Sequence, residues 1–350
     1  MVKILKLLAS FIGGLVLIII VFLIYATITD YTPEEKTLVD VESSDTGIAV
    51  GNELSLLSWN IGYAGLGSGE TFFMDGGVGV LPNEEDVNSN FEAIKSFINS
   101  QNADIYLLQE VDINSTRTNG LNEYEEIKNL KREYDSTFAY NYKVSYVPYP
   151  WPMLGHMESG LATLSKFDVK SSTRYQFPGN YSWPKKLGFL DRCFVEHRLP
   201  IDGSEKELIV INTHNSAYDS GGTLRKKQLD YLKNYMKERY EEGNYVVIGG
   251  DWNHLLPGIT EDWFKTERPM PSWAMKMEAD WALEGWNWGF DETIPTVRAL
   301  DLPFERGRNF MTVIDGFLVS PNIEIDSVEG IDLDFVNSDH NPVKINISLK

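Results

Sequence analysis

Residues 245–253 read Tyr-Val-Val-Ile-Gly-Gly-Asp-Trp-Asn, an apolar run that ends abruptly in a carboxylate and an amide. An uninterrupted run of this length is typical of a buried strand, and the glycines favour a change of direction after it. Comparable runs precede or abut four other polar groups: Asn60, Gln109-Glu110, Thr213-His214 and Ser338-Asp339-His340. A single Asp or His at a strand end is more often a turn residue, but five strand ends could converge on one cleft.

Two helices alternate with these strands. The segment 84–98 repeats apolar residues at three- and four-residue steps, and 224–240 has an apolar face of the same kind, so both are predicted helices. Strand–helix–strand therefore occurs twice, over 54–108 and 207–248. Further strands are predicted at 135–148, 159–177, 189–199, 313–319, 323–328 and 343–349. Two mixed sheets packed together, with helices outside, are the expected fold.

The polar residues at the strand ends suit metal-assisted attack of water on phosphorus. Glu110 and Asp339, with Asp251 nearby, offer the oxygen ligands that Mg²⁺ or Ca²⁺ prefers. The asparagines at 60 and 253 can bind a phosphate oxygen or orient a water without adding charge. The histidines at 214 and 340 can move protons or stabilise a negative transition state.

Composition narrows the class of protein. The 350 residues are 43% hydrophobic, and the single cysteine, Cys193, excludes disulfide scaffolds and cysteine metal clusters. There are 31 basic and 51 acidic residues, a net charge of −20. Such an acidic surface disfavours tight binding of duplex nucleic acid, while small phosphorylated substrates stay open.

The amino terminus is set apart from the rest. Residues 1–6 are expected to be a cytoplasmic stub, 7–28 a transmembrane anchor, 29–52 a polar linker and 53–350 the catalytic domain. The apolar run is long enough to cross a bilayer, and Lys3 and Lys6 before it favour a cytoplasmic amino terminus, with the domain outside. A cleaved signal peptide is the competing interpretation, although its apolar stretch is usually shorter.

These motifs, in this order, resemble those of the endonuclease/exonuclease/phosphatase superfamily. The segments that carry the resemblance are 57–61 (Leu-Ser-Trp-Asn-Ile), 107–111 (Leu-Leu-Gln-Glu-Val), 160–166 (Gly-Leu-Ala-Thr-Leu-Ser-Lys), 212–214 (Asn-Thr-His), 250–253 (Gly-Asp-Trp-Asn), 314–317 (Ile-Asp-Gly-Phe) and 338–342 (Ser-Asp-His-Asn-Pro). The resemblance covers about residues 53–350. It implies an α/β (α+β) four-layered sandwich of two mixed sheets flanked by helices, here preceded by one transmembrane helix.

The resemblance also implies roles for single residues. Glu110 would bind the catalytic Mg²⁺, for which Mn²⁺ or Ca²⁺ could substitute, with Asp339 and Asn60 helping in the metal and phosphate shell. Asp251 would position or deprotonate the attacking water, assisted by Asn253. The remaining assignments are a dyad of His340 with Asp315, and contact of His214 with the scissile phosphate. The identity of the general base stays open at this point.

Substrate choice is less constrained by the sequence. Six tryptophans lie close together in the sequence, at 252, 263, 273, 281, 286 and 288. We expect them to form a satellite core, a small hydrophobic core packed beside the sheets, rather than a substrate-binding or membrane-facing lid. The aromatic residues at 146–151, 181 and 183 could belong to either arrangement. Arg117 could reach a substrate phosphate, and the loop 72–79 is expected to rim the cleft. His156, His197 and His254 are expected to be ordinary polar residues.

The sequence therefore predicts a membrane-anchored, extracytoplasmic, Mg²⁺-dependent phosphoesterase that acts on a phospholipid-type or other small phosphodiester rather than on a monoester. An extracellular nuclease is the alternative enzyme. A catalytically silent binding domain on a membrane stalk is the alternative of another class. No protein partner is implied.

Overall fold

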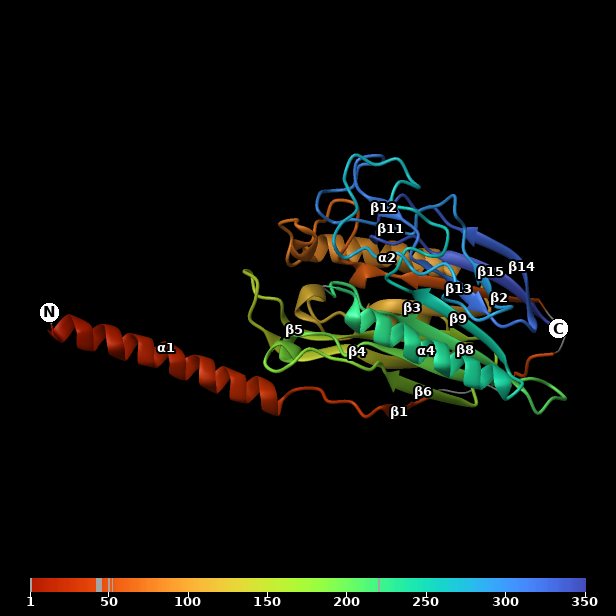
Figure 1. Cartoon of the computed structure of the whole chain (residues 1–350), viewed down its shortest axis with the longest axis horizontal. Coiled ribbons are helices and arrows are strands. Elements are labelled where there is room, and N and C mark those ends of the chain that lie inside the picture. Colours follow the sequence, from red (N-terminus) through yellow and green to blue (C-terminus); the bar gives the residue numbers. More distant parts are fainter. Residues whose placement is uncertain (1, 42–45, 50, 52, 220) are drawn as a thin grey trace.

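The computed structural model describes residues 2–41, 46–49, 51, 53–219 and 221–350, and these form two large β-sheets (Figure 1). The seven-stranded sheet has the order β1 (Lys36–Val39), β6 (Ser171–Gln176), β7 (Cys193–Pro200), β8 (Glu207–His214), β9 (Tyr245–Asp251), β13 (Asp315–Val319) and β10 (Asn287–Gly289). The six-stranded sheet has the order β14 (Ile323–Gly330), β15 (Val343–Leu349), β2 (Glu53–Asn60), β3 (Ile105–Asp112), β5 (Gly155–Ser165) and β4 (Asp135–Val147). β11 (Val297–Arg298) and β12 (Met311–Thr312) form a separate pair.

The described helices are α1 (Val2–Ile28), α2 (Glu84–Ser100), α3 (Glu123–Leu130) and α4 (Thr223–Glu241). Short 3-10 helices occur at Gly62–Ala64, Phe73–Asp75, Thr116–Thr118 and Lys185–Gly188.

Three apolar cores stack the elements into four layers, which confirms the predicted sandwich. Leu232 and Met236 of α4 pack with Ile248 on the outer face of the seven-stranded sheet. The apolar positions of α2 pack with Trp59 and Leu108 on the outer face of the other sheet. A third core, including residues 56, 107, 210, 247, 317 and 345, fills the space between the sheets. Because each helix buries one apolar stripe, removing these stripes from water stabilises the layered arrangement.

The sheet registers bring polar strand ends to one edge. β2 runs parallel to β3, with Asn60 paired to Gln109, and β8 runs parallel to β9, with His214 paired to Asp251. β13 is antiparallel to β9 and pairs Asp315 with Asp251. The two strand–helix–strand units therefore deliver their polar residues to the same end of the molecule.

The predicted elements agree with the structure in most places, with the following differences. The strand predicted over 159–177 is two strands, β5 and β6, which belong to different sheets. The helix α3 and the short strands β10–β12 were not predicted from the sequence. α3 has few apolar positions, Tyr124 and Ile127 among them. Asn122, just before the helix, caps it by accepting a hydrogen bond from the backbone N–H of Glu125 on its side chain.

The segment expected to be a polar linker is partly structured. β1 extends the seven-stranded sheet by pairing with β6, and Ile48 is fully buried and bridges to Ile201. Residues 42–45, 50 and 52 of that segment lie outside the described residues. The expectation of a simple tether over 29–52 is wrong for 36–39, because the exposed edge of β6 supplies hydrogen-bonding partners that a local sequence pattern does not reveal.

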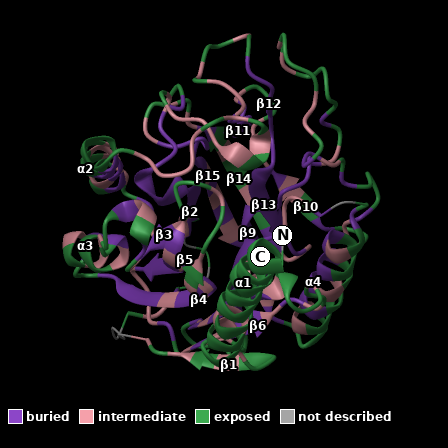
Figure 2. Ribbon diagram, turned by 90° about the vertical axis from the view of Figure 1, so that its left-hand side faces the viewer, coloured by how far each residue is buried: buried purple, intermediate pink, exposed green. Residues whose placement is uncertain are grey.

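α1 extends away from the domain, and no described residue of it is buried (Figures 1 and 2). It is 27 residues long, and an 18-residue window within it has a mean hydropathy of 3.1, so it is long and apolar enough to cross a membrane, as a signal sequence near the amino terminus also can be.

The tryptophan-rich stretch mostly packs into a core rather than a lid, as predicted, but this core is continuous with that of α4 on the seven-stranded sheet and is not a separate satellite. Trp252 is fully buried against Trp281 and Trp288 in edge-to-face contacts, and Trp273 and Trp286 are buried in the same core. Trp263 is the exception, with an exposed fraction of 42%.

Candidate active site

The polar strand ends meet at a cavity of about 530 Å³ at the edge of the two sheets. Of the predicted site residues, those that line it are Glu110, Arg117, His214, Asp251, Asn253, Asp339 and His340. Asn60 and Asp315 lie directly behind this lining, each within hydrogen-bonding distance of one of its members. The structure thus brings together all nine residues singled out from the sequence.

Asp251, at the end of β9, is the centre of the arrangement. Its Oδ2 accepts a hydrogen bond from Asn60 Nδ2 at 3.1 Å and lies 3.3 Å from His214 Nε2 and 3.9 Å from His340 Nε2. Its Oδ1 accepts from the backbone N–H of Asn253 at 2.8 Å. Burial and the nearby Asp315 raise the pKa of Asp251 to about 7, so near neutral pH it can exchange a proton.

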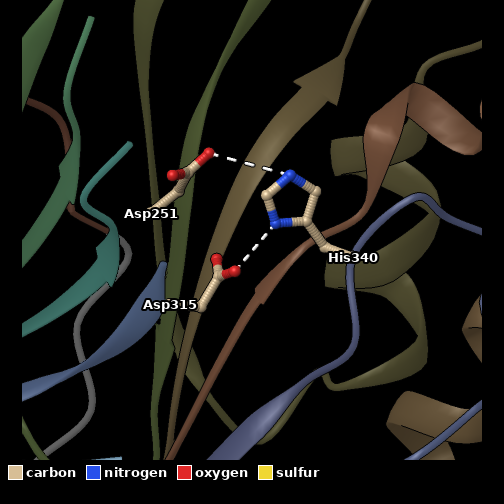
Figure 3. Close-up of side chains that lie close together, drawn as sticks. All are labelled: Asp251, Asp315 and His340. Carbon is tan, nitrogen blue, oxygen red and sulfur yellow. Dashed lines mark hydrogen bonds and ion pairs between the residues drawn. The ribbon is translucent and has the colours of Figure 1, made fainter. Parts of the chain in front are cut away.

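His340 and Asp315 form a buried dyad (Figure 3). The imidazole Nδ1 of His340 lies 2.8 Å from Asp315 Oδ2, while its Nε2 faces Asp251. Burial alone would lower the pKa of His340, but Asp315, Asp339 and Asp251 outweigh it and raise this pKa to about 10. The imidazole is therefore charged at neutral pH and can stabilise negative charge on a substrate or donate a proton.

Hydrogen bonds from two segments of the chain hold this dyad in place. Thr296 Oγ1 accepts from the backbone N–H groups of Ile314 and Asp315, at 2.9 and 3.0 Å. Trp59 Nε1 donates to the His340 carbonyl oxygen at 2.9 Å. The dyad geometry is thus tied to the buried end of β2 and to the connection before β11.

His214 differs from His340 in its charge state. Burial, with Arg192 and His340 nearby, lowers its pKa well below the usual value, so the ring is neutral. Asn141 Nδ2 lies 3.3 Å from Nδ1 and can donate to it, which places the ring proton on Nε2, the atom that faces Asp251. His214 can therefore donate a hydrogen bond into the cavity, but it is a poor source of positive charge.

The carboxylates predicted to bind metal lie beside this group. Glu110 has a positive φ of 53°, at an irregularity of the β3–β5 ladder between Leu108 and Val111. Such bulges re-aim side chains next to active sites. Its Oε1 lies 3.4 Å from Asn60 Nδ2 and 3.8 Å from His214 Nε2.

Asp339 is the second of these carboxylates. Its buried Oδ1 has no hydrogen-bond partner in the described part of the chain, and burial, with Glu110 nearby, raises its pKa to about 7. A β-carbon at Gly62, whose φ is +53°, would come within 2.9 Å of that oxygen. An unpartnered buried carboxylate next to a second carboxylate is an environment that a divalent cation would complete, so these residues fit a bound metal.

A third set of potential ligands overlaps the dyad. Single ligand atoms of Asp251, Asp315 and His340 lie within 4.8 Å of one another. Since His340 Nδ1 is already bonded to Asp315, we interpret this set as a proton-transfer group, while the family's divalent metal would lie nearer Glu110 and Asp339.

Arg117 lies in the cavity wall but is already engaged. Its guanidinium group donates to both carboxylate oxygens of Asp112, at 2.9 and 3.0 Å, and lies 3.4 Å above the ring of Tyr63. Arg192 also lines the cavity, and its buried Nη1 has no hydrogen-bond partner among the described residues. Of the two, Arg192 has the donor free for a phosphate, whereas the substrate contact predicted for Arg117 stays a prediction.

Three features of the site were missed. Asn141 lies within β4 between tyrosines, where an alternating aromatic pattern gave no functional signal. Tyr218 Oη donates to Asp75 Oδ1 at 2.5 Å, and the backbone N–H of Leu300 donates to Oδ2. This contact fixes the loop 72–79, which lines the cavity as predicted.

The third missed feature is Asn215. Asn253, which has a positive φ of 50°, donates a hydrogen bond to the carbonyl oxygen of Asn215. Only the position of Asn215 directly after the Thr-His motif could have suggested this contact.

The other histidines lie outside the cavity lining, as expected for ordinary polar residues. His156 is half-buried near Asn114, His254 is buried with its Nδ1 2.8 Å from the Trp252 carbonyl oxygen, and His197 is buried in β7.

Known folds resemble this architecture at low sequence identity. An endonuclease/exonuclease/phosphatase from Beutenbergia cavernae has a TM-score of 0.56 and 16% identity, covering 85% of this chain and 72% of its own. Caenorhabditis elegans TDP2 has a TM-score of 0.53 and 17% sequence identity, and the match covers 85% of this chain and 75% of TDP2. The human nocturnin catalytic domain with bound sulfate has a TM-score of 0.52 and 16% sequence identity, and the match covers 89% of this chain and 97% of the nocturnin domain. These likenesses concern the fold alone.

No curated protein matches the chain significantly. A sequence profile described as the Endonuclease/Exonuclease/phosphatase family, in contrast, matches residues 57–340, which is most of the chain and includes every predicted site residue. The chain therefore belongs to the endonuclease/exonuclease/phosphatase family and is a hydrolytic enzyme of the phosphoesterase and nuclease type.

Proposed function

We propose that this enzyme is a Mg²⁺-dependent phosphodiesterase, anchored in the cell membrane by residues 7–28, with its catalytic domain on the extracytoplasmic side. Its proposed substrate is a phospholipid-type or other small phosphodiester. The observation that carries the proposal is the position of Asp251 between two histidines of different charge, beside two carboxylates, at the base of a largely apolar cavity.

The metal would be held by Glu110 and Asp339, with Asn60 completing the shell. When bound, Mg²⁺ would supply positive charge next to the phosphate oxygens. Mn²⁺ or Ca²⁺ could substitute, since the ligands are hard oxygen donors.

The side chains of the site can accept and donate the protons that the hydrolysis requires. A water oxygen forms a bond to phosphorus, and its proton moves to Asp251, whose pKa of about 7 suits a general base at neutral pH. The bond from phosphorus to the leaving oxygen breaks. Charged His340 lies next to Asp251 and can stabilise the developing charge or protonate the leaving oxygen, while His214 and Arg192 donate hydrogen bonds to the phosphate.

The cavity walls favour a substrate with an apolar part. Aromatic and aliphatic side chains dominate the lining, among them residues 63, 66, 72, 73, 142, 147, 149, 154, 181, 189 and 190. A net charge of −20 disfavours a long polyanion. A small or lipid diester fits both observations.

An extracellular nuclease is the second candidate, favoured by the arginines 117 and 192 in the cavity wall. Its rate would fall steeply with salt, because phosphate contacts are screened. The alternative of a silent binding domain finds no support, because the complete set of catalytic side chain types lies in one cavity.

The test uses the full-length protein in detergent, with Mg²⁺ or with a chelator. Substrates are bis-p-nitrophenyl phosphate, p-nitrophenyl phosphate, phospholipid vesicles and plasmid DNA. We expect Mg²⁺-dependent cleavage of diesters that is abolished in His340→Ala and retained in the matched control His156→Ala, whose ring lies outside the cavity lining. Faster cleavage of the monoester, or of plasmid DNA over vesicles, would refute the proposed substrate class. Equal activity in both histidine variants would refute the site.

A further inference from the structure

The connection between β4 and β5 carries an unusual surface. Residues 144–155 read Val-Ser-Tyr-Val-Pro-Tyr-Pro-Trp-Pro-Met-Leu-Gly and contain no Asp, Glu, Lys, Arg or His, in a chain that is 23% charged. Trp151 has an exposed fraction of 82% and Tyr149 of 71%, and Tyr146 and Met153 are also exposed. Large apolar side chains gathered on a surface mark a site of interaction.

A second exposed tryptophan lies on the connection between β6 and β7. Trp183 has an exposed fraction of 54%, and its Nε1 donates to Thr27 Oγ1 at 3.1 Å. Three residues later, Lys186 Nζ lies 2.8 Å from Asp30 Oδ2. Thr27 is in the last turn of α1 and Asp30 follows directly after it, where the apolar helix gives way to acidic residues.

The two connections project on the same side of the domain. In Figure 1 the yellow-green loop between β4 and β5 extends on the side where α1 lies, and its tip is level with the last turns of α1 along the long axis of the molecule. Viewed from that side, α1 points toward the reader in front of β4 and β6 (Figure 2). We call Tyr146, Tyr149, Trp151, Met153 and Trp183 together the aromatic rim.

We propose that the aromatic rim is a membrane-binding surface whose occupant is the interfacial layer of the same bilayer that α1 crosses. The inference rests on the membrane anchoring in the proposed function. If α1 spans the bilayer, its last turn lies at the membrane–water interface, and a tryptophan hydrogen-bonded to that turn lies there too. Tryptophan and tyrosine are enriched at this depth because each combines an apolar ring with one polar atom.

The aromatic rim also places the cavity relative to the membrane. Val147 at the end of β4 and Tyr149 and Leu154 of the first connection line the cavity, and so do Tyr181 and Phe189 of the second. The loops that would touch the bilayer therefore form one wall of the site. A lipid phosphodiester could reach Asp251 while its apolar part stays against that wall.

A protein that recognises proline-rich segments is the other conceivable occupant of residues 148–152. The contacts with Thr27 and Asp30 favour the bilayer, because they hold Trp183, one end of the rim, beside the end of an apolar helix.

The test reconstitutes the full-length protein, with no other protein, in liposomes whose lipids carry bromine near the glycerol backbone. Bromine quenches tryptophan emission only over short distances. Two of the nine tryptophans, about a fifth of the emission if all emit equally, are expected at the interface. Trp151→Phe and Trp183→Phe should each reduce the quenched part of the emission. The matched control is Trp263→Phe: Trp263 is also exposed but lies beside Glu292, to whose carbonyl oxygen its Nε1 donates, so this variant should leave the quenched part of the emission unchanged.

Unchanged quenching in both rim variants, or an equal loss in the control, would overturn the proposal. A second arm compares hydrolysis of a vesicle phospholipid with that of bis-p-nitrophenyl phosphate. We expect Trp151→Ser to lower the ratio of the two rates several-fold and Trp263→Ser to leave it unchanged; an unchanged ratio in Trp151→Ser would also refute the role. Quenching needs no catalysis, so failure of the hydrolase assignment and failure of the membrane-binding surface give different results.

Discussion

Replacing His197 with leucine should make the protein less sensitive to acid. His197 lies in β7 with no exposed surface, and neither ring nitrogen has a hydrogen-bond partner among the described residues. Burial lowers the pKa of His197 to about 3, while an unfolded histidine has a pKa near 6.5. Between these two pH values the unfolded chain binds a proton that the folded chain does not, so the free energy of unfolding falls as the pH falls.

The size of the effect follows from the two pKa values. Each pH unit below 6.5 lowers the free energy of unfolding by about 1.4 kcal/mol, so at pH 5 His197 alone has lowered it by roughly 2 kcal/mol. Leucine has a similar volume, carries no proton and leaves no unpaired nitrogen in the core. The variant should therefore be at least as stable as the wild type at pH 7.5 and clearly more stable at pH 5.

The measurement is urea unfolding of the full-length protein in detergent at pH 7.5 and pH 5, followed by circular dichroism. The difference between the two pH values is taken for each protein, and the two differences are then compared, so that groups other than His197 cancel. A wild-type loss that exceeds the variant's by about 2 kcal/mol is expected. Equal losses, within about 0.5 kcal/mol, would mean that His197 is protonated or solvated in the folded state.

Three further changes test the site and its support. Asp315→Asn removes the strongest group that raises the pKa of His340, so kcat on bis-p-nitrophenyl phosphate at pH 7.5 should fall by about 10² or more, and a loss below threefold would contradict the dyad. Glu110→Gln should reduce the rise in Tm that Mg²⁺ produces in the wild type, as seen by circular dichroism without substrate; an undiminished rise would exclude Glu110 as a ligand. Gly250→Ala should lower the free energy of unfolding in urea by more than about 2 kcal/mol, because its β-carbon would lie 2.0 Å from the Thr213 carbonyl oxygen at a φ of +148°, and a loss under about 1 kcal/mol would show that the strands adapt.

Much of the site could be predicted because its residues follow apolar runs. The runs before Asn60, His214 and Asp251 define buried strands by composition alone, and parallel strands in one sheet end at the same edge. Contacts across the sheets were not predictable in this way. Asn141 reaches His214 only because β4 and β8 face each other across the site, a relation that no local pattern encodes.

Charge states were equally hidden in the sequence. His214 and His340 are the same residue type at similar strand ends, yet burial and Arg192 keep one neutral while Asp315 keeps the other charged. β1 is a comparable case in the fold, since four residues of mixed polarity form a strand only because the edge of β6 is available to them.

The paired positions of β8, β9 and β13 place His214, Asp251 and Asp315 in a single row across three adjacent strands. Residues separated by about a hundred positions in the chain are thereby fixed by the backbone ladders of three neighbouring strands, at the ends of those strands. The cavity walls, by contrast, are largely supplied by connections such as 72–80, 147–154 and 181–190. Chemistry and selectivity thus belong to separable parts of the molecule, so exchanging whole connections should redirect the enzyme to other esters while the row of reacting groups stays in register.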